Sequence, residues 1–238
     1  MIDLSIVIPV FNERDNIEPI VIELLDVLPG LTSRFEILLV DDGSDDGSRE
    51  VIDRVAAANH SVVPLHLREN RGQTAAFDAG FRKARGEWVV TMDGDMQNDP
   101  RDIGRLLDAA GDDLDAVVGY RRSREDSWHR RVLSRLANGI RNVVSGDDII
   151  DTCCSLKAFR RKCLTVLKLH VGMHRFLPTL LRIEGFRVGQ IPVNHRPRHS
   201  GQSKYGIWDR AWRSFIDLLA VRWMKSRRLD YEVVHREH

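Results

Sequence analysis

The sequence contains little that would build a cross-linked, secreted or membrane-spanning protein. Only three of its 238 residues are cysteines, and the adjacent Cys153 and Cys154 are poorly placed to pair with each other or to share a tetrahedral metal. No uncharged apolar run reaches the roughly 18 residues that a membrane-spanning helix needs. Residues 1–4 also lack the basic and then apolar profile of a signal peptide. We therefore predict buried free thiols and a cytoplasmic protein.

The sequence also lacks two common nucleotide-binding signatures. No Gly-x-x-x-x-Gly-Lys-Ser/Thr loop occurs in the chain, and no Gly-x-Gly-x-x-Gly segment follows a predicted strand. Both signatures work by bringing backbone N–H groups to phosphate oxygens at the start of a helix. Their absence argues against a P-loop NTPase and against a Rossmann dehydrogenase.

The net charge is close to zero, but acidic and basic residues are distributed unevenly along the chain. The formal charge is +1, whereas residues 1–115 hold 24 acidic and 11 basic residues, and residues 116–238 hold 11 acidic and 25 basic residues. A protein that follows nucleic-acid phosphates does not usually carry so acidic a half. The pattern therefore argues against a nucleic-acid binder and favours a site that holds cations and anions together.

Alternating strand and helix patterns dominate the first half of the chain. Short apolar runs rich in β-branched residues predict strands, and most are followed by a polar turn and a stretch with helical periodicity. Such alternation is typical of an α/β fold with a mostly parallel, Rossmann-like sheet wrapped by helices. Strands are expected at 4–10, 36–40, 62–67, 88–92 and 115–120, and helices at 17–28, 48–58, 73–84 and 101–110.

The pattern is looser after residue 120. No internal repeat or Pro/Gly-rich linker separates the two halves, so we predict a single domain over residues 1–225. Its second half is expected to lie against the carboxyl edge of the sheet. Helices are expected there at 127–145, 161–168 and 174–183, a strand at 186–193 and an amphipathic helix at 207–225, with a polar tail at 226–238.

Acidic side chains follow three of the predicted strands at the points where the strands end. Glu13 follows the first strand, Asp41 and Asp42 follow the second, and Asp93 and Asp95 follow the fourth. Because the carboxyl ends of parallel strands meet at one edge of an α/β sheet, we expect these carboxylates to converge. The spacing of Asp93 and Asp95 suits one hard cation, and Mg²⁺ and Mn²⁺ favour such oxygen ligands. The alternative is a pair of solvated acids in a turn, which is the commoner interpretation of an isolated Asp-x-Asp.

A glycine-containing basic segment occupies residues 195–205. It carries three strong cations together with hydroxyl side chains, which suits a loop that folds over phosphate oxygens. A solvated loop is the alternative. Facing a metal site, such cations would stabilise a diphosphate leaving group.

These motifs together resemble glycosyltransferase family 2, which has the GT-A fold. The resemblance covers nearly the whole chain, to about residue 225, and the motifs occur in the family's order. It is strongest to the branch that uses polyprenyl phosphates, which includes dolichol-phosphate mannosyltransferase and bacterial undecaprenyl-phosphate sugar transferases. The matching segments are Pro9-Val-Phe-Asn-Glu13, Val40-Asp-Asp-Gly-Ser44, Asn70-Arg-Gly72, Asp93-Gly-Asp-Met-Gln97 and the stretch from Arg198 to Lys204-Tyr205.

The resemblance implies an Mg²⁺ or Mn²⁺ cofactor and a nucleotide-sugar donor. Asp93 and Asp95, which flank Gly94, match the residues that hold the metal on the diphosphate, and Gln97 lies beside them. Residues 1–120 would then bind the donor and the metal, and residues 121–206 would bind the acceptor and the phosphates. The other donor residues that the resemblance implies are Pro9, Phe11 and Glu13 for the nucleoside, Asp42 for the base, and Arg121, Arg198 and Lys204 for the phosphates.

The resemblance also implies a lipid phosphate as the acceptor. Such an acceptor is already anionic and needs no general base, and inversion at the anomeric carbon is expected. No acidic base followed by a Gln/Arg-x-x-Arg-Trp motif occurs between residues 140 and 200. Asp151 could be proposed as a base, although a cap or turn role is commoner for Asp before a polar segment. The implied acceptor residues are Arg130, Arg131 and Ser134, and the implied catalytic set is Asp95, Arg130, Arg198 and Lys204.

The predicted helix at 207–225 combines an apolar stripe with a basic end. Its three tryptophans favour a membrane interface, and the alternative is that the stripe packs on the domain core. We expect a peripheral protein on the cytoplasmic face of an anionic membrane, held by this helix or by a separate integral membrane protein. The apolar residues are Trp208, Ala211, Trp212, Phe215, Leu219 and Trp223, and the basic ones are Arg210, Arg213, Arg222, Lys225, Arg227 and Arg228.

Other functions compete with sugar transfer to a polyprenyl phosphate. Within the same family, the acceptor could be a saccharide hydroxyl. A phosphoryl-transfer enzyme of the haloacid-dehalogenase type would also use an Asp-x-Asp pair, but it expects Thr or Val where this chain has Gln97. A receiver-like phosphorylation module could use Asp41 and Asp42, but it would not need the basic second half. A nucleotide-sugar sensor would use the same binding residues without turnover.

Overall fold

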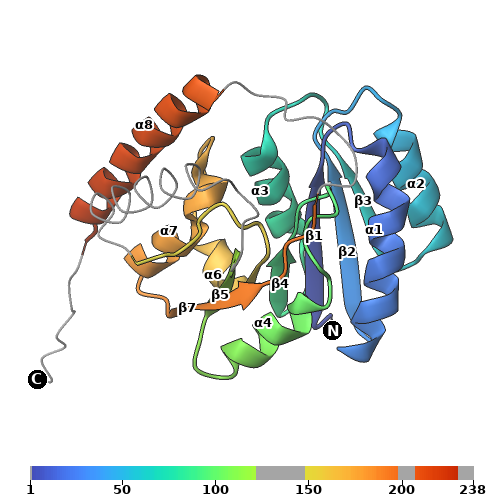
Figure 1. Cartoon of the computed structure of the whole chain (residues 1–238), viewed down its shortest axis with the longest axis horizontal. Helices are drawn as coiled ribbons and strands as arrows, with labels where there is room; N and C mark the ends of the chain where they lie inside the picture. The colour runs from blue at the N-terminus through green and yellow to red at the C-terminus, as the bar shows by residue number, and fades with distance from the viewer. Residues whose placement is uncertain (1, 122–147, 198–206, 230–238) are drawn as a thin grey trace, which may run out of the picture.

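The computed structural model describes residues 2–121, 148–197 and 207–229, and for residues 207–214 it describes the backbone alone (Figure 1). Within these ranges the chain forms a seven-stranded sheet in the order β3-β2-β1-β4-β6-β5-β7. The strands are β1 (Leu4–Val10), β2 (Phe35–Asp41), β3 (Val62–His66), β4 (Trp88–Thr91), β5 (Ala116–Arg121), β6 (Lys157–Arg160) and β7 (Val188–Val193). The α-helices are α1 (Arg14–Val27), α2 (Ser48–Ala58), α3 (Gln73–Lys83), α4 (Asp102–Ala110), α6 (Arg161–Thr165), α7 (Leu177–Ile183) and α8 (Ile207–Ser226).

The central strands are apolar throughout because both faces of the sheet are covered. Neighbouring residues of a strand point to opposite faces, so Ile6 and Ile8 of β1 join one core and Val7 joins the other. All three side chains are fully buried. Strands β3, β2, β1 and β4 pair in parallel, with Val7 in register with Leu38 of β2 and with Thr91 of β4. The α/β class and the mostly parallel sheet are therefore confirmed.

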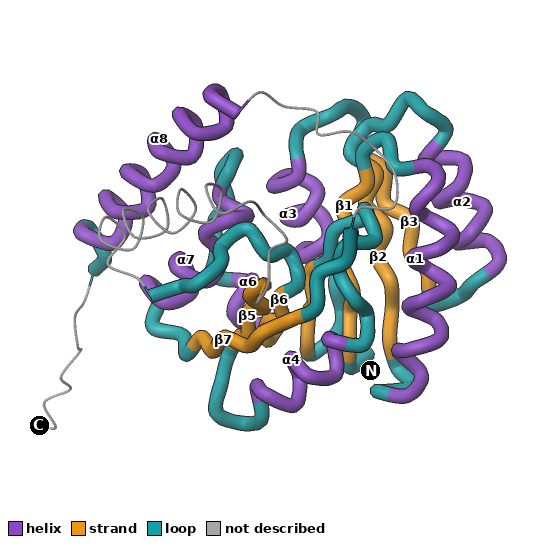
Figure 2. Tube along the Cα trace, in the orientation of Figure 1, coloured by secondary structure: helices purple, strands orange, loops and turns teal. Residues whose placement is uncertain are grey.

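Helices form a layer on each face of the sheet, and a further helix lies outside one layer (Figure 2). Helices α1, α2 and α4 pack against one face, and α3, α6 and α7 pack against the other. The last helix, α8, packs on α7 rather than on the sheet, through Leu218 and Val221. None of the described helices is long and apolar enough to cross a membrane.

The structure differs from the predictions mainly in the second half. Strand β6 was not predicted, and it pairs antiparallel with both β4 and β5. The helix predicted at 161–168 ends at Thr165, and the one predicted at 174–183 is a 3-10 turn at Met173–Phe176 followed by α7. These elements are short, and tertiary packing rather than local periodicity sets where they begin and end. The helix predicted at 127–145 lies outside the described residues.

Helix α8 has two apolar faces, where a single stripe was predicted. Leu218 and Val221 are buried against Met173, Phe176 and Leu180. The predicted stripe is the other face, because Phe215, Leu219 and Trp223 are exposed. Part of α8 therefore packs on the domain, but through a face that was not predicted, while Phe215, Leu219 and Trp223 of the predicted stripe are exposed.

Candidate active site

The loops after β1 and β2 are tied together at the carboxyl edge of the sheet. Pro9 of β1 is in register with Val40 of β2, and the backbone N–H of Asn12 donates to the Ser44 hydroxyl over 3.0 Å. The Glu13 N–H donates to the Ser48 hydroxyl over 3.1 Å. Pro9 and Phe11 are half-buried beside these loops. The segment predicted to hold the nucleoside is thus positioned by the segment that carries Asp42.

The two acids at the end of β2 are held by different donors. Asp41 accepts from the Ser44 N–H over 2.8 Å and from Arg49 Nε over 3.0 Å. Asp42 accepts from the backbone N–H groups of Arg71 and Gly72 over 2.7 and 2.8 Å. Burial raises the pKa of the Asp42 carboxyl, and the neighbouring Asp41 charge adds to that rise. The two segments 40–44 and 70–72 are therefore one structural unit at the sheet edge.

Gly43 makes this unit possible. Its φ of +71° is in the left-handed region, and a Cβ there would lie 2.5 Å from the backbone N of Asn70. Both the backbone conformation and the close approach of the two loops require glycine at this position.

The turn after β4 brings the predicted metal ligands together. Asp95 is 6% exposed and Gly94 is buried between the two aspartates, where a Cβ would lie 3.3 Å from the Pro9 carbonyl oxygen. Met96 has a φ of +63°, and the Gln97 N–H donates to Asp95 Oδ1 over 3.2 Å. Burial raises the pKa of the Asp93 carboxyl, and the Asp95 charge raises it further. A divalent cation would remove this repulsion between the carboxylates.

The first turn of α3 links the acidic turn to the second half of the chain. Gln73 Nε2 donates to Asp93 Oδ1 over 2.8 Å. The Thr74 hydroxyl lies 2.7 Å from His174 Nδ1 and accepts from the Gly172 N–H. Burial lowers the pKa of His174 to about 3, so this imidazole is neutral at physiological pH. Gln73 thereby fixes one of the predicted metal ligands from a rigid helix end.

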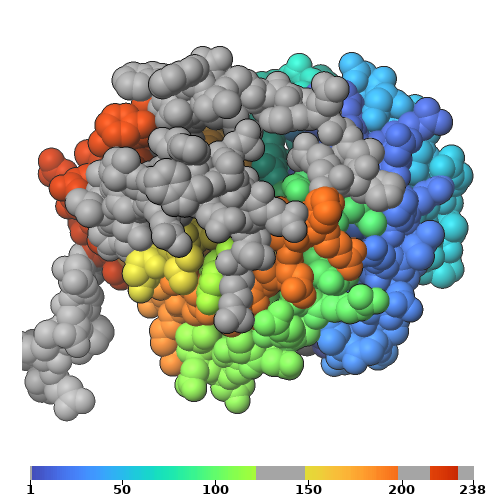
Figure 3. All heavy atoms as spheres, viewed as in Figure 1, coloured from blue at the N-terminus to red at the C-terminus, as the bar shows by residue number. Residues whose placement is uncertain are grey.

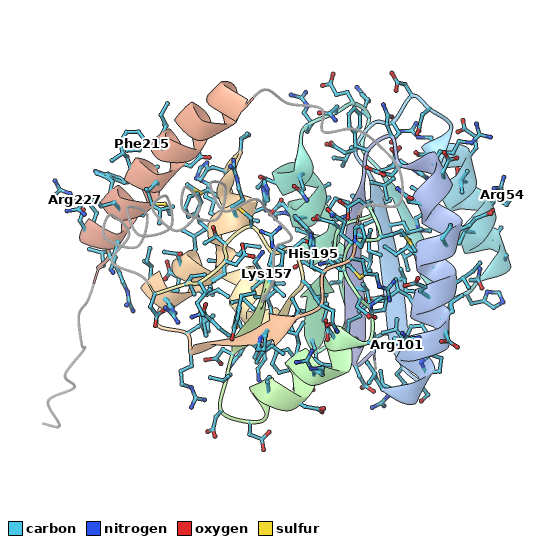
Figure 4. All side chains as sticks on the ribbon, in the orientation of Figure 1. Arg54, Arg101, Lys157, His195, Phe215 and Arg227 are labelled. Atoms are coloured by element: carbon cyan, nitrogen blue, oxygen red, sulfur yellow. The ribbon has the colours of Figure 1, made fainter. Side chains whose placement is uncertain are left out.

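A buried lysine lies behind the acidic turn. Lys157 of β6 is 4% exposed, and its ammonium donates to the Cys154 carbonyl oxygen. Burial lowers its pKa, while the charge of Asp93 acts in the opposite direction. Figure 4 labels Lys157 in the middle of the molecule, and β6 pairs it with Thr91 of β4, two residues before Asp93. Neither Lys157 nor Gln73 was predicted, because neither belongs to a local motif that marks it.

The segment after β7 runs along the acidic turn. The Arg196 N–H donates to the Gln97 carbonyl oxygen over 2.8 Å, and Gln97 Nε2 donates to the Arg196 carbonyl oxygen over 3.3 Å. The Arg196 guanidinium bridges Glu23 and Asp99 at 2.8 and 3.0 Å. In Figure 3, orange atoms from this part of the chain lie against the green atoms of the segment after β4. The start of the predicted basic segment is thus at the site.

Arg121, at the end of β5, is already paired. Its Nε and one terminal nitrogen donate to the two carboxylate oxygens of Asp151 over 2.7 and 3.0 Å. Both side chains are nearly buried, and the Cys153 N–H donates to Asp151 as well. Asp151 therefore holds Arg121 and closes a turn, which is the structural role expected of it. The remaining predicted site residues, Arg130, Arg131, Ser134, Arg198 and Lys204, lie outside the described residues.

The donor set of the site fits Mg²⁺ or Mn²⁺. No group of three or more His, Cys, Asp or Glu side chains gathers around a metal position in the described ranges. Asp93 and Asp95 supply carboxylate oxygens alone, and Mg²⁺ commonly binds through one or two carboxylates with substrate phosphates and water. The pair therefore suits a cation that arrives with a phosphate-bearing substrate.

The fold and the acidic turn define a GT-A-type α/β protein, and solved structures share its fold. A mannosyltransferase from Pyrobaculum calidifontis in complex with GDP-Man and Mn²⁺ aligns with a TM-score of 0.67 over 96% of this chain and 65% of its own, at 22% identity. Glucosyl-3-phosphoglycerate synthase from Mycobacterium tuberculosis, in complex with Mn²⁺, UDP and phosphoglyceric acid, aligns with a TM-score of 0.69 over 96% of this chain and 80% of its own, at 18% identity.

Residues 5–167 match the profile of Glycosyl transferase family 2, and the chain belongs to this family. It is 38% identical over 92% of its length to a dodecaprenyl-phosphate galacturonate synthase from Rhizobium johnstonii. It is 39% identical over 86% of its length to an undecaprenyl-phosphate 4-deoxy-4-formamido-L-arabinose transferase from Edwardsiella ictaluri. The chain covers 66% and 63% of the length of these two relatives.

Proposed function

We propose that this protein is an inverting, metal-dependent glycosyltransferase that moves a sugar from a nucleotide-sugar to a polyprenyl phosphate at the cytoplasmic face of a membrane. The observation that carries the proposal is the Asp93-Gly94-Asp95 turn at the carboxyl edge of the sheet, whose two carboxylates are the kind of ligand that a hard cation takes. The relatives named for polyprenyl phosphates support the acceptor class. A GT-A fold with this turn supports the donor class.

On this proposal, Asp93 and Asp95 hold the metal on the donor diphosphate and Gln97 lies beside it. The metal, when bound, neutralises charge on the departing nucleoside diphosphate. Glu13 and Asp42, on the two interlocked loops, contact the ribose and the base, with Pro9 and Phe11 beside them. Arg198 and Lys204 supply further positive charge to the diphosphate.

The acceptor needs no general base because a phosphate monoester is already anionic. The pairing of Asp151 with Arg121 supports this view, because Arg121 donates to both carboxylate oxygens of Asp151, the residue that could otherwise be proposed as a base. Arg121 uses two of its five N–H donors in that pair and keeps the others for phosphate oxygens. Arg130, Arg131 and Ser134 hold the acceptor phosphate in line with the anomeric carbon.

Membrane attachment through α8 is the second part of the proposal. Phe215, Leu219 and Trp223 form an exposed apolar face on a helix that carries basic residues. An integral membrane partner would add a second attachment point. Residues 1–120 act as the donor and metal-binding part, residues 121–206 as the acceptor and phosphate-binding part, and 207–225 as the membrane helix.

The experiment that tests the function has two stages. Thermal stability is measured with UDP-, GDP- and CDP-linked sugars, each with and without Mn²⁺, and the donor that stabilises the protein is then incubated with undecaprenyl phosphate. Mass spectrometry of the lipid should find a glycosylated lipid phosphate formed only with metal. A donor that binds without lipid product, but with transfer to an added saccharide, would support the hydroxyl-acceptor alternative. No stabilisation by any nucleotide-sugar would contradict the proposal.

A further inference from the structure

A cavity of about 530 Å³ lies between α7, the segment 166–170 and the end of α8, on the far side of the molecule from α1 and α2. Its lining is mixed, and the apolar part comes from residues that include Leu167, Leu180, Ile183 and Met224, with Trp223 at the side. Leu180 and Ile183 are buried, whereas Trp223 is 64% exposed. The cavity is thus a partly apolar hollow that opens beside the exposed face of α8.

Positive charge surrounds this cavity. Lys168, Arg227 and Arg228 line it and are exposed, and Glu184 is its one carboxylate among the described residues. Within the part of the chain that the structure describes, no carboxylate lies within ion-pair distance of Lys168, Arg227 or Arg228. Some exposed arginines elsewhere are paired, as Arg34 is with Asp3 and Arg82 is with Asp78. Three cations without a carboxylate partner around an apolar hollow complement a ligand that is anionic at one end and apolar at the other.

We infer that this cavity binds the headgroup and the adjoining acyl segment of an anionic membrane phospholipid. Lys168, Arg227 and Arg228 would contact the lipid phosphate, and the apolar walls would cover the first carbons of its chains. Trp223 belongs both to the cavity and to the exposed face of α8, so the bound lipid would extend the membrane-contacting surface of the helix. The inference rests on the proposed membrane attachment and adds a specific lipid class to it.

The test compares two triple variants of the full chain that remove the same charge. K168A/R227A/R228A removes the cavity cations, and K83A/R54A/R101A removes one lysine and two arginines from other parts of the surface. Figure 4 shows Arg54 and Arg101 at the opposite end of the molecule from Phe215 and Arg227. Binding is measured by co-sedimentation with phosphatidylcholine vesicles that contain or lack phosphatidylglycerol.

We expect wild-type protein to bind the vesicles that contain phosphatidylglycerol and to bind the neutral ones far less. The cavity variant should lose on the order of 100-fold in affinity, because each of the three basic residues near an anionic surface contributes about fivefold. The distant variant should keep nearly all of its affinity, since charges beyond a Debye length of about 8 Å are screened. Equal losses in the two variants would overturn the inference.

A second variant tests the cavity without removing a cation. Glu184→Gln removes the cavity's carboxylate from an exposed position, so the fold should be unaffected and the affinity for phosphatidylglycerol vesicles should rise several-fold. Calorimetry with short-chain phosphatidylglycerol below its micelle concentration should give the same order of affinities. Glu184→Gln should bind most tightly, wild type less tightly and the cavity variant least tightly. Binding of polyprenyl phosphate in place of phosphatidylglycerol would contradict the inference.

Transfer activity measured with detergent-solubilised acceptor separates this inference from the proposed function. All of these variants should retain it, because none of the substituted residues belongs to the donor, metal or acceptor positions. Normal transfer in detergent by a wild-type protein that ignores anionic vesicles would overturn the lipid site and leave the proposed function standing. A wild-type protein that binds anionic vesicles normally but transfers no sugar would overturn the proposed function and leave the lipid site standing.

Discussion

The buried acids of the first half and the exposed cations around the α7–α8 cavity differ in how they are partnered. In the first half, buried acids are matched individually to donors: Glu36 accepts from Ser5 and Arg85, and Asp42 accepts from two backbone N–H groups. In the second half, the cations around the α7–α8 cavity stay exposed, and no carboxylate of the described residues pairs with them. Buried charge must be paired because desolvation is costly, whereas exposed charge is available to a partner.

This difference indicates two kinds of recognition. The acidic edge positions each carboxylate from a strand end or a helix end, which suits a small ligand with fixed geometry. The surface around the α7–α8 cavity offers exposed apolar side chains and the exposed cations Lys168, Arg227 and Arg228, which suits a broad anionic surface. Substitutions of the buried acids in the first half should therefore act on catalysis or folding, and those on the exposed surface around α8 should act on binding.

The largest effect is expected from Asp95→Asn. The amide has the shape of the carboxylate but no charge, so on the proposed function the metal is bound more weakly while the fold is kept. A metal contributes several kcal/mol to charge stabilisation, so we expect sugar transfer to fall at least roughly 100-fold. The pKa of Asp93 should also fall, because the Asp95 charge that raises it is gone. Turnover measures the loss of activity, and a thermal melt shows whether the variant is folded. Full activity in a folded variant would contradict the assignment of Asp95 as a metal ligand.

Much of the first half was predictable because its signals are local. Each of its strands is a short apolar run followed by a polar turn, and parallel pairing brings the ends of those strands to one edge whatever the loop details. The convergence of Asp42 with the 70–72 segment and the location of Asp93 after β4 follow from that rule. Gly43 could also have been singled out, since an Asp-Gly turn often needs a positive φ.

The second half was harder to predict because its contacts are distant in sequence. β6 has four residues, two of them charged, and Lys157 is buried only because β6 pairs between β4 and β5. Arg196 contacts Glu23, which is 173 residues earlier in the chain, and no local sequence pattern predicts so distant a contact. The two apolar faces of α8 were equally hard to predict, since the apolar pattern of the helix does not indicate which residues pack against the domain.

Two adjacent leucines of α8 sharpen the comparison between buried and exposed surface. Leu218 is 5% exposed and Leu219 is 46% exposed. Leu218→Ala leaves a cavity against α7 and should lower the free energy of unfolding by about 2–5 kcal/mol. Leu219→Ala should stay within about 0.5 kcal/mol of wild type and should instead weaken vesicle binding. Chemical denaturation measures both, and equal destabilisation would show that the second face also packs on protein.

Gln73→Ala tests whether the helix end positions the metal ligand. Loss of the hydrogen bond to Asp93 should weaken Mn²⁺ binding roughly 10- to 100-fold, which is the usual cost of removing an outer-shell partner. Calorimetric titration with Mn²⁺ and a nucleoside diphosphate measures this directly. Lys83→Ala, an exposed change at the other end of α3, is the matched control. Unchanged Mn²⁺ affinity in Gln73→Ala would mean that Asp93 needs no such support.

The smallest effect concerns the pH dependence of Asp41 beside Asp42. Burial alone would raise the pKa of Asp41, but hydrogen bonds from Ser44, Arg49 and His66 lower it below its usual 3.8, whereas burial raises that of Asp42. An acid whose folded pKa is lowered stabilises the fold above its unfolded pKa, and this contribution disappears as the pH falls through the folded value. For Asp42 the sign is opposite, so protonation of Asp42 as the pH falls towards 3.8 should stabilise the fold.

Asp41→Asn should therefore cost about 1 kcal/mol at neutral pH, because the amide keeps only some of the hydrogen bonds. The cost should shrink below pH 3.8, where the wild-type carboxyl is itself being protonated. Denaturation at several pH values measures how the cost changes with pH. Carbon-detected NMR titration of both carboxyls measures the lowered pKa of Asp41 and the raised pKa of Asp42 separately. A cost that does not change with pH would show that Asp41 acts through packing, and that charge matching in the first half is less specific than the hydrogen bonds indicate.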